Sequence, residues 1–302
     1  MRLHLKSVAA VFVFLFSVSP MAGAVDLLFV TLDNNSVQKY DTNGTDLGVF
    51  ANTNLGNPQG IAVNALGDVF VSRPLDQSIS RFDSTGSAQG SITTNLSFPY
   101  GLAFTPSGDL LSVNGGDNKI LRFNAAGVYQ SNAATTNLDN PRAIAVDSSG
   151  SFYVVNDNTD KISKFNSAGT FQFEISSNLS APRGVAIDSS GYLFVANYSS
   201  NTISKFNSSG AYQSSGSIST GLSNPFGLAI DSQNNLYVSN QGPHSIGKYG
   251  PTGTLLTSWS TGANIPRYLA IQPVPEPSTY ALGAIATSVM VAVARRRKAR
   301  KG

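Results

Sequence analysis

Three arginines follow a proline in closely related heptapeptides of this 302-residue chain. They are Arg142 in NPRAIAV, Arg183 in APRGVAI and Arg267 in IPRYLAI. A guanidinium group binds a carboxylate or a sulfate through two parallel hydrogen bonds. The matching positions of three further heptapeptides hold Gln59, Tyr100 and Phe226. Because aromatic rings stack on flat apolar faces such as those of sugars, the residue types indicate binding of a saccharide or an acidic polymer.

A second set of polar residues ends the aromatic and β-branched runs that follow the heptapeptides. This set consists of Asn114, Asn156, Asn197 and Asn240. The loops after these runs, and after the matching run near residue 70, hold Asp76, Asp117, Asp160, Asn201 and His244. Alternation of antiparallel strands predicts that all these residues share one end of a repeated sheet with the arginines. Two interpretations remain open: this end binds a ligand, or its residues are solvated and the asparagines cap turns.

Residues suited to acid–base or metal chemistry are scarce. The chain has no cysteine, which excludes thiolate catalysis and cysteine-ligated metals. Between residues 25 and 272 it has one histidine, His244, in a loop and one glutamate, Glu174, in an outer strand. It contains no Gly-x-Ser-x-Gly elbow, no His-Glu-x-x-His motif and no P-loop. We therefore predict no catalytic residues, no metal and no cofactor.

Six prolines at regular spacing divide the chain into similar units. They are Pro58, Pro99, Pro141, Pro182, Pro225 and Pro266, separated by 41, 42, 41, 43 and 41 residues. A period near 40 indicates β-propeller blades or an array of similar units. Within residues 181–222, four strand-like runs alternate with glycine-containing turns, and their hydrophobicity falls from the first run to the fourth. A blade requires this gradient when its first strand lines a channel and its fourth faces solvent.

The two ends of the repeated region complement each other. Residues 27–55 match the second, third and fourth strands of a unit, and residues 265–273 match the first strand alone. We therefore predict an all-β, six-bladed β-propeller of four-stranded blades, in which the N-terminal strands and the C-terminal strand complete one blade. Such closure removes the exposed sheet edges of an open array. An open solenoid is the alternative, but it would need capping units.

The segments YVVNDNTDKISKFNSAGTF and LFVANYSSNTISKFNSSGAY resemble NHL repeats, the blade type of many six-bladed propellers. The resemblance covers nearly all of residues 25–272. NHL repeats often carry aspartate after the second strand, where this chain has the four asparagines. Streptogramin B lyases and gluconolactonase-like lactonases use similar propellers. This likeness implies, as an alternative function, a metal-dependent lyase or lactonase with acidic or histidine groups around a metal in the channel.

The net charge of the repeated region differs from that of the whole chain. Residues 25–272 hold 12 basic and 16 acidic residues, a net charge near −4, whereas the whole chain carries +3. A negative body argues against nucleic acid as a partner. The cations that precede an aromatic residue in the third strands are expected to lie along neighbouring blades. They are Lys39, Arg81, Arg122, Lys164, Lys205 and Lys248.

The N-terminal segment has the features of a secretory signal peptide. Two basic residues precede an apolar run over residues 8–18, and Ala22 and Ala24 form a small-residue cleavage site. We therefore assign residues 1–24 to a signal peptide and residues 25–272 to the propeller. Since the chain is cysteine-free, the core and the closure of the ring must hold an exported domain together.

The C-terminal segment, residues 273–302, combines three features. Pro275, Glu276 and Pro277 precede an apolar span over residues 278–294, which is at the short limit for crossing a bilayer. A basic cluster that includes Arg295, Arg296 and Arg297 follows and would stay in the cytoplasm. This order closely resembles the PEP-CTERM sorting signal of Gram-negative-type bacteria, with residues 275–277 as the recognition triplet and the arginines as the stop-transfer cluster.

The PEP-CTERM resemblance implies a partner and a route. An exosortase-type membrane protease would cut near the triplet after transient anchoring in the inner membrane. The propeller would then reach the cell surface, the outer envelope or the extracellular space. We therefore predict a non-catalytic protein that binds or scaffolds exopolysaccharide, matrix or an envelope protein.

Overall fold

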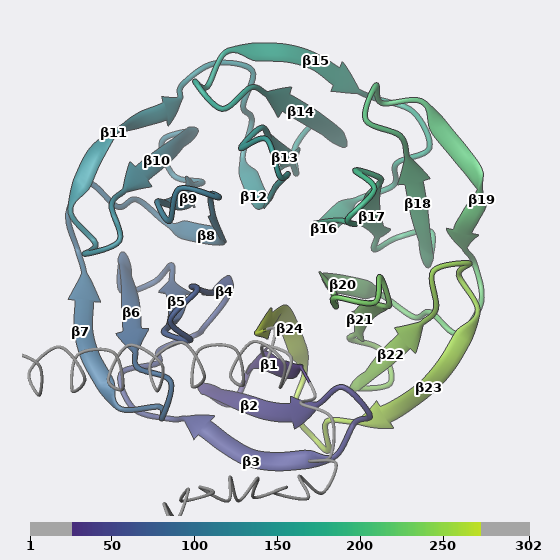
Figure 1. Ribbon diagram of the computed structural model, residues 1–302, viewed down its shortest axis with the longest axis horizontal. Coiled ribbons are helices and arrows are strands. Elements are labelled where there is room, and N and C mark those ends of the chain that lie inside the picture. The colour runs from purple at the N-terminus through teal and green to yellow at the C-terminus, as the bar shows by residue number, and fades with distance from the viewer. Residues whose placement is uncertain (1–25, 273–302) are drawn as a thin grey trace, which may run out of the picture. The chain divides into compact units, whose positions relative to one another are not determined.

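A computed structural model describes residues 26–272, and these residues form six antiparallel sheets of four strands each. The sheets are the blades of a ring around a central axis (Figure 1). Blade 1 contains β24 (Pro266–Gln272), β1 (Leu27–Leu32), β2 (Ser36–Asp41) and β3 (Asp46–Ala51). Blade 2 contains β4 (Ile61–Val63), β5 (Val69–Arg73), β6 (Ser78–Phe82) and β7 (Ala88–Ile92). Blade 3 contains β8 (Pro99–Phe104), β9 (Leu110–Asn114), β10 (Lys119–Phe123) and β11 (Tyr129–Ala134).

The other three blades repeat this order from the inner strand to the outer strand. Blade 4 contains β12 (Pro141–Val146), β13 (Phe152–Asn156), β14 (Lys161–Phe165) and β15 (Phe171–Ile175). Blade 5 contains β16 (Pro182–Ile187), β17 (Leu193–Asn197), β18 (Thr202–Phe206) and β19 (Tyr212–Ile218). Blade 6 contains β20 (Pro225–Ile230), β21 (Leu236–Asn240), β22 (Ser245–Tyr249) and β23 (Leu255–Ser260). The predicted all-β, six-bladed propeller is confirmed.

Blade 1 closes the ring from the two ends of the repeated region. The C-terminal strand β24 pairs antiparallel with β1, so that Leu269 lies opposite Val30 and Ile271 lies opposite Leu28. The strand order β24-β1-β2-β3 is the composite blade that the complementary ends predict. β24 is the inner strand of blade 1, and it lies between the inner strands β20 and β4 of the neighbouring blades (Figure 1). The ring is therefore closed at the composite blade.

In blade 4, burial is greatest in the second strand and falls from there to the rim, whereas the hydrophobicity gradient predicts a fall from the first strand. All five residues of β13 are buried, whereas β15 has two exposed residues, two partly exposed residues and one buried residue. The innermost strands pack backbone against backbone. A Cβ atom on Gly60 would lie 2.1 Å from the carbonyl oxygen of Tyr100, and one on Gly184 would lie 2.1 Å from that of Phe226. Glycine is therefore required at these two positions, where the inner strands of neighbouring blades meet.

Cations of the third strands connect neighbouring blades. Lys164 Nζ donates to the carbonyl oxygen of Ser208 at 3.0 Å, and Lys248 Nζ donates to that of Thr42 at 2.9 Å. Lys164 Nζ also lies 4.9 Å from the centroid of the Tyr153 ring, a cation–π contact. These side chains reach the turn between the third and fourth strands of the next blade, as expected from the sequence.

The loop that enters each first strand and the loop between the second and third strands lie together at one end of the ring, which we call the mouth face. The backbone N–H of Asp157 donates to the carbonyl of Asn140, and that of Tyr198 donates to the carbonyl of Ala181, both at 3.2 Å. These bonds hold the two kinds of loop side by side. The predicted site residues therefore share one face, because each of them belongs to one of these loops or to the adjoining strand end.

Candidate ligand-binding site at the channel mouth

Two rings of side chains surround the mouth of the channel. The first ring consists of the residue after each repeat proline: Gln59, Tyr100, Arg142, Arg183, Phe226 and Arg267. The second ring consists of the residue after each second strand: Asp33, Pro74, Gly115, Asp157, Tyr198 and Gln241. Both positions vary in chemistry from blade to blade, although the strands that carry them are nearly identical. The scaffold is thus repeated while the mouth is not.

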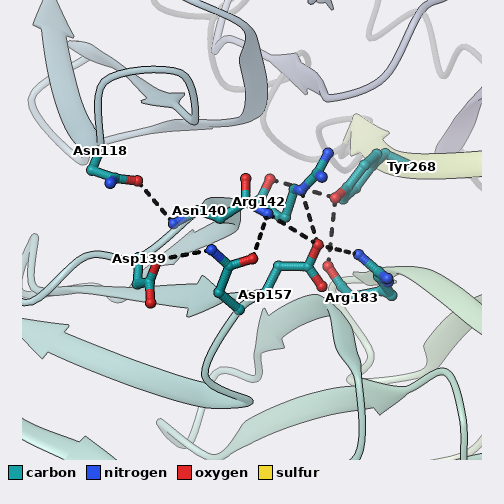
Figure 2. Close-up of polar contacts among 8 residues, drawn as sticks. Asn118, Asp139, Asn140, Arg142, Asp157, Arg183 and Tyr268 are labelled. Carbon is teal, nitrogen blue, oxygen red and sulfur yellow. Dashed lines mark hydrogen bonds and ion pairs between the residues drawn. The ribbon is translucent and has the colours of Figure 1, made fainter.

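A carboxylate from the second ring joins two arginines of the first ring (Figure 2). Asp157 Oδ2 lies 3.2 Å from Arg142 Nε and 2.6 Å from Arg183 Nη1. The Asp157 side chain is 13% exposed, so solvent screens this cluster only partly. The Arg142 guanidinium also lies over the Tyr100 ring, 4.1 Å from its centroid. These contacts fix both guanidinium groups on one side of the mouth.

Aromatic side chains form the next part of the mouth and its floor. The Phe226 ring packs edge to face against Tyr198 at 6.3 Å and against Tyr268 at 5.1 Å between centroids. The Tyr268 hydroxyl lies 3.4 Å from the carbonyl oxygen of Arg142 and 3.5 Å from that of Arg183, across the ring from its own strand (Figure 2). Burial raises the pKa of this hydroxyl, so it stays protonated. A cavity of about 40 Å³ remains beside Tyr268 along the axis.

Arg267 differs from the other arginines of the described residues. Within residues 26–272, each of the other arginines has a carboxylate oxygen within 3.2 Å of its guanidinium, and Arg267 has none within ion-pair distance. Its Nε atom is buried and has no hydrogen-bond partner in this part of the chain. The two rings therefore combine three guanidinium groups with two carboxylates: Asp157, which contacts two of the guanidinium groups, and Asp33, whose Oδ1 accepts a hydrogen bond from the backbone N–H of Ile265 at 2.8 Å. This surplus of positive charge favours an anionic ligand.

The four asparagines of the predicted site are buried and hold the mouth loops. Asn156 Oδ1 accepts a hydrogen bond from the backbone N–H of Asp139 at 3.0 Å, and Asn156 Nδ2 donates to Ser163 Oγ at 2.9 Å. Asn197 and Asn240 accept equivalent bonds from backbone N–H groups, and Asn114 Nδ2 donates to a backbone carbonyl. These hydrogen bonds match the turn-capping interpretation. Gln59 is also buried, whereas the arginines and aromatic residues are partly exposed.

Charged residues of the loops between the second and third strands pair locally. Asp76 Oδ2 lies 3.2 Å from Arg73 Nη1, and Asp117 Oδ2 lies 2.9 Å from Lys119 Nζ. His244, in the loop between β21 and β22, adopts a positive φ of 49°. Glu174 pairs with Lys161 at 2.8 Å on the outer strand β15, where the sequence places it.

Sequence reasoning missed Asp157, Tyr198 and Tyr268. A signal was available for Tyr268, because this residue breaks the repeat at a mouth position. Tyr268 occupies a place where the other five blades have a small residue, namely Gly60, Gly101, Ala143, Gly184 and Gly227. Comparing the blades position by position would have found Tyr268, whereas the position of Asp157 and Tyr198 has no repeated residue from which they depart.

The closed ring defines a six-bladed β-propeller whose residues at one end of the channel vary from blade to blade. The chain belongs to the virginiamycin B lyase family, whose sequence profile matches residues 20–273. The PEP-CTERM protein-sorting motif matches residues 273–298. This motif confirms the resemblance at the C-terminus and implies export, membrane-anchored sorting in Gram-negative bacteria and processing by an exosortase. No curated protein sequence matches the chain.

Solved structures share the fold at low sequence identity. A chain in the crystal structure of a nidogen/laminin complex has a TM-score of 0.72 at 19% identity and covers 82% of this chain and 98% of that one. Virginiamycin B lyase from Staphylococcus aureus has a TM-score of 0.62 at 18% identity and covers 80% and 83%. A streptogramin B lyase has a TM-score of 0.59 at 17% identity and covers 78% and 74%. At such identities the likeness concerns the fold alone.

The lyase resemblance implies a metal, and the residues present do not fit one. Residues 26–272 contain no group of three or more histidine, cysteine, aspartate or glutamate side chains that could hold a metal ion. At the mouth, the two guanidinium groups beside Asp157 would oppose a cation at that carboxylate. The sequence-derived alternative of a metal-dependent lyase therefore finds no donor set in this part of the chain.

The membrane-related predictions concern other parts of the chain. The assigned signal peptide and the span over residues 278–294 lie outside the described residues. Within residues 26–272, no helix is long and apolar enough to cross a bilayer.

Proposed function

We propose that this chain is an exported, non-catalytic propeller that binds an extracellular partner through the mouth face. The sorting motif supports delivery beyond the inner membrane, and the cell surface or the extracellular matrix is the proposed destination. The observation that carries the binding role is Arg267, a partly buried guanidinium without a carboxylate partner in the same ring of mouth residues as Arg142 and Arg183. An acidic exopolysaccharide would supply the missing anion, and a protein with an acidic surface is the alternative partner of the same site.

The chemistry of the mouth favours a polymer of uronic acid units. A carboxylate would accept hydrogen bonds from the partly exposed guanidinium of Arg267, which has no carboxylate of residues 26–272 within ion-pair distance. The rings of Phe226 and Tyr198 lie next to the arginines and offer faces for sugar stacking. The Arg142–Asp157–Arg183 cluster would hold its shape while the ligand binds, because its charges are already paired.

Replacing Arg267 by glutamine is expected to weaken binding of hexagalacturonate about tenfold or more, since a hydrogen bond to a charged group contributes roughly 1.5–3 kcal/mol. The triple change of Arg142, Arg183 and Arg267 to alanine is expected to abolish it. Arg122→Gln is the matched control, because Arg122 pairs with Asp109 at 3.1 Å and also donates to blade 4 from the third strand of blade 3. Isothermal titration calorimetry at two salt concentrations measures these effects. No saturable binding of hexagalacturonate, or equal loss in Arg122→Gln, would refute the acidic-ligand site.

Family membership favours one second candidate, a metal-dependent lyase or lactonase. One solved relative is a catalytically inactive histidine-to-alanine variant of Staphylococcus aureus virginiamycin B lyase with quinupristin. We expect that the purified chain neither binds Mg²⁺ or Mn²⁺ with submicromolar affinity nor cleaves quinupristin, because residues 26–272 lack a donor cluster. Calorimetry with each metal and chromatography of the quinupristin reaction test this. A stoichiometric metal with turnover would replace the binding proposal by the lyase.

A further inference from the structure

Blade 5 departs from the others in its outer strand. The interval of 43 residues between Pro182 and Pro225 is the longest in the repeat, and β19 is the longest fourth strand at seven residues. In blade 4 the third and fourth strands pair residue for residue from Ile162–Ile175 to Lys164–Phe173. In blade 5 the paired residues are Ile203–Ile218 and Lys205–Gln213. Four residues, 214–217, therefore lie opposite Ser204 alone and form a wide bulge.

The bulge has its own hydrogen bonds. Ser217 Oγ donates to the carbonyl oxygen of Gln213 at 2.8 Å and accepts from the backbone N–H of Lys205 at 3.2 Å. Gly216 has a positive φ of 86°, which lets the chain turn back toward β18. Bulges of this kind redirect side chains and often lie next to binding sites. Here the displaced strand borders a pocket of about 440 Å³ between β18, β19 and the loop that enters blade 5.

The pocket is lined by hydroxyl groups and contains no charged side chain. Its serine and threonine lining comes from the entering loop, from β18 and its preceding turn, and from β19 and the residue after it. Ser180, Ser214 and Ser219 have no side-chain hydrogen-bond partner in the described part of the chain, so their hydroxyls are available. Ile203 and Ile218 form a buried apolar base. The lining thus combines amphoteric hydrogen-bonding groups with an apolar surface.

Tyr212 provides a rigid aromatic wall. Its side chain is 41% exposed, and its ring packs edge to face against the buried Phe206 at 5.8 Å between centroids. Because one edge of the ring is held by the core, the ring loses little conformational freedom when a ligand packs against it. Tyr129 in blade 3 makes the same contact with Phe123 at 6.0 Å, but it does not line this pocket.

We propose that the blade 5 pocket binds a neutral sugar unit of a polysaccharide. Sugar hydroxyls donate and accept hydrogen bonds, as serine and threonine hydroxyls do, and the apolar face of a sugar ring packs on Tyr212. A carboxylate or sulfate would be desolvated here without an opposing charge, which disfavours acidic units. The volume lies within the range of about 300–1,000 Å³ for small-ligand sites. This site differs from the mouth rings in ligand chemistry, although its lining includes Ser180 and Ser200 from two mouth-face loops of blade 5.

Titration of the full chain with neutral hexasaccharides tests the proposal. The probes are cellohexaose, laminarihexaose, maltohexaose and mannohexaose, with hexagalacturonate as the charged comparison. At least one neutral probe is expected to bind saturably, and Tyr212→Ala is expected to weaken that binding about tenfold, whereas Tyr129→Ala, the matched change in blade 3, leaves it unchanged. Arg267→Gln is also expected to leave it unchanged, and added salt has little effect because no charge is involved.

A second variant guards against a folding defect. Removal of Ser214 and Ser215 shortens β19 to the length of a regular fourth strand without touching the core residues Ile203 and Ile218. If this variant keeps the wild-type melting temperature and loses the neutral sugar, the bulge forms the site. Absence of saturable binding for all four neutral probes, or binding that survives both changes, overturns the proposal. Loss of hexagalacturonate binding alone would concern the mouth and not this pocket.

Discussion

Ending the chain after Ile265, so that β24 is lost, is expected to abolish cooperative folding. β24 is the inner strand of blade 1, and its residues Tyr268, Leu269 and Ala270 are buried. Full burial of each large apolar side chain contributes roughly 1.5–3 kcal/mol, and a typical domain has a net stability of only about 5–15 kcal/mol. The loss also leaves β1 without its antiparallel partner and separates β20 from its neighbour in the ring. The edge of β1 that becomes exposed in this way favours aggregation.

The matched control is a chain that ends at Gln272. It keeps β24 and lacks only residues 273–302, so it is expected to melt cooperatively at the temperature of the full chain. Circular dichroism during heating and size-exclusion chromatography compare the two truncations. A cooperative, monomeric chain ending at Ile265 with a melting temperature within a few degrees of the control would show that the composite blade does not hold the ring together.

The closure could be predicted from the sequence because the two incomplete units carry different strands. Residues 27–55 lack the channel-side run and residues 265–273 contain only that run. The register, in which Leu28 lies opposite Ile271, is known only from the structure. The number of blades follows from the regular spacing of the prolines.

The mouth was only partly predictable. The place of Arg142 and Arg183 follows from strand alternation, but their joint contact with Asp157 depends on side-chain conformations across two blades. The asparagines illustrate the opposite case. A polar side chain at a strand end can face a ligand or a loop. For Asn156 the structure decides between the two, because the backbone N–H of Asp139 donates a hydrogen bond to its Oδ1 atom. Likewise, the long interval in blade 5 was visible as a length, whereas the pocket depends on how residues 214–217 fold back.

Tyr268 is the side chain that fills the centre of the ring, and replacing it by alanine is expected to lower the free energy of unfolding by about 3–5 kcal/mol. Its ring packs against Phe226, and its hydroxyl reaches the carbonyls of Arg142 and Arg183 on other blades. The five small residues at the matching positions cannot close over the space, because their strands already meet backbone to backbone. A large buried aromatic replaced by alanine leaves a cavity, and such changes cost this much in other cores.

The Tyr268→Phe variant separates the contribution of the hydroxyl to stability from that of the aromatic ring. The two hydroxyl contacts are long, at 3.4 and 3.5 Å, so this variant is expected to lose no more than about 1 kcal/mol at neutral pH. Urea denaturation of both variants at pH 8 measures the difference. Equal stability of Tyr268→Ala and the wild type would show that the centre of the ring does not contribute to the core.

Comparing the wild type with Tyr268→Phe at alkaline pH tests whether the Tyr268 hydroxyl is buried at the ring centre. Burial raises the pKa of the Tyr268 hydroxyl above the value of about 10 for an unfolded tyrosine. The unfolded chain then releases this proton first as the pH rises, so the contribution to stability is complete below about pH 10 and is lost above it. Burial also raises the pKa of Tyr40 and of Tyr249 to about 12, so the wild type should lose stability between pH 10 and 12 through several groups. Tyr268→Phe should lose less over the same interval, because it lacks one of these protons. An identical loss in the two proteins, measured by urea denaturation at each pH, would mean that solvent reaches the Tyr268 hydroxyl and that the mouth is open to the channel.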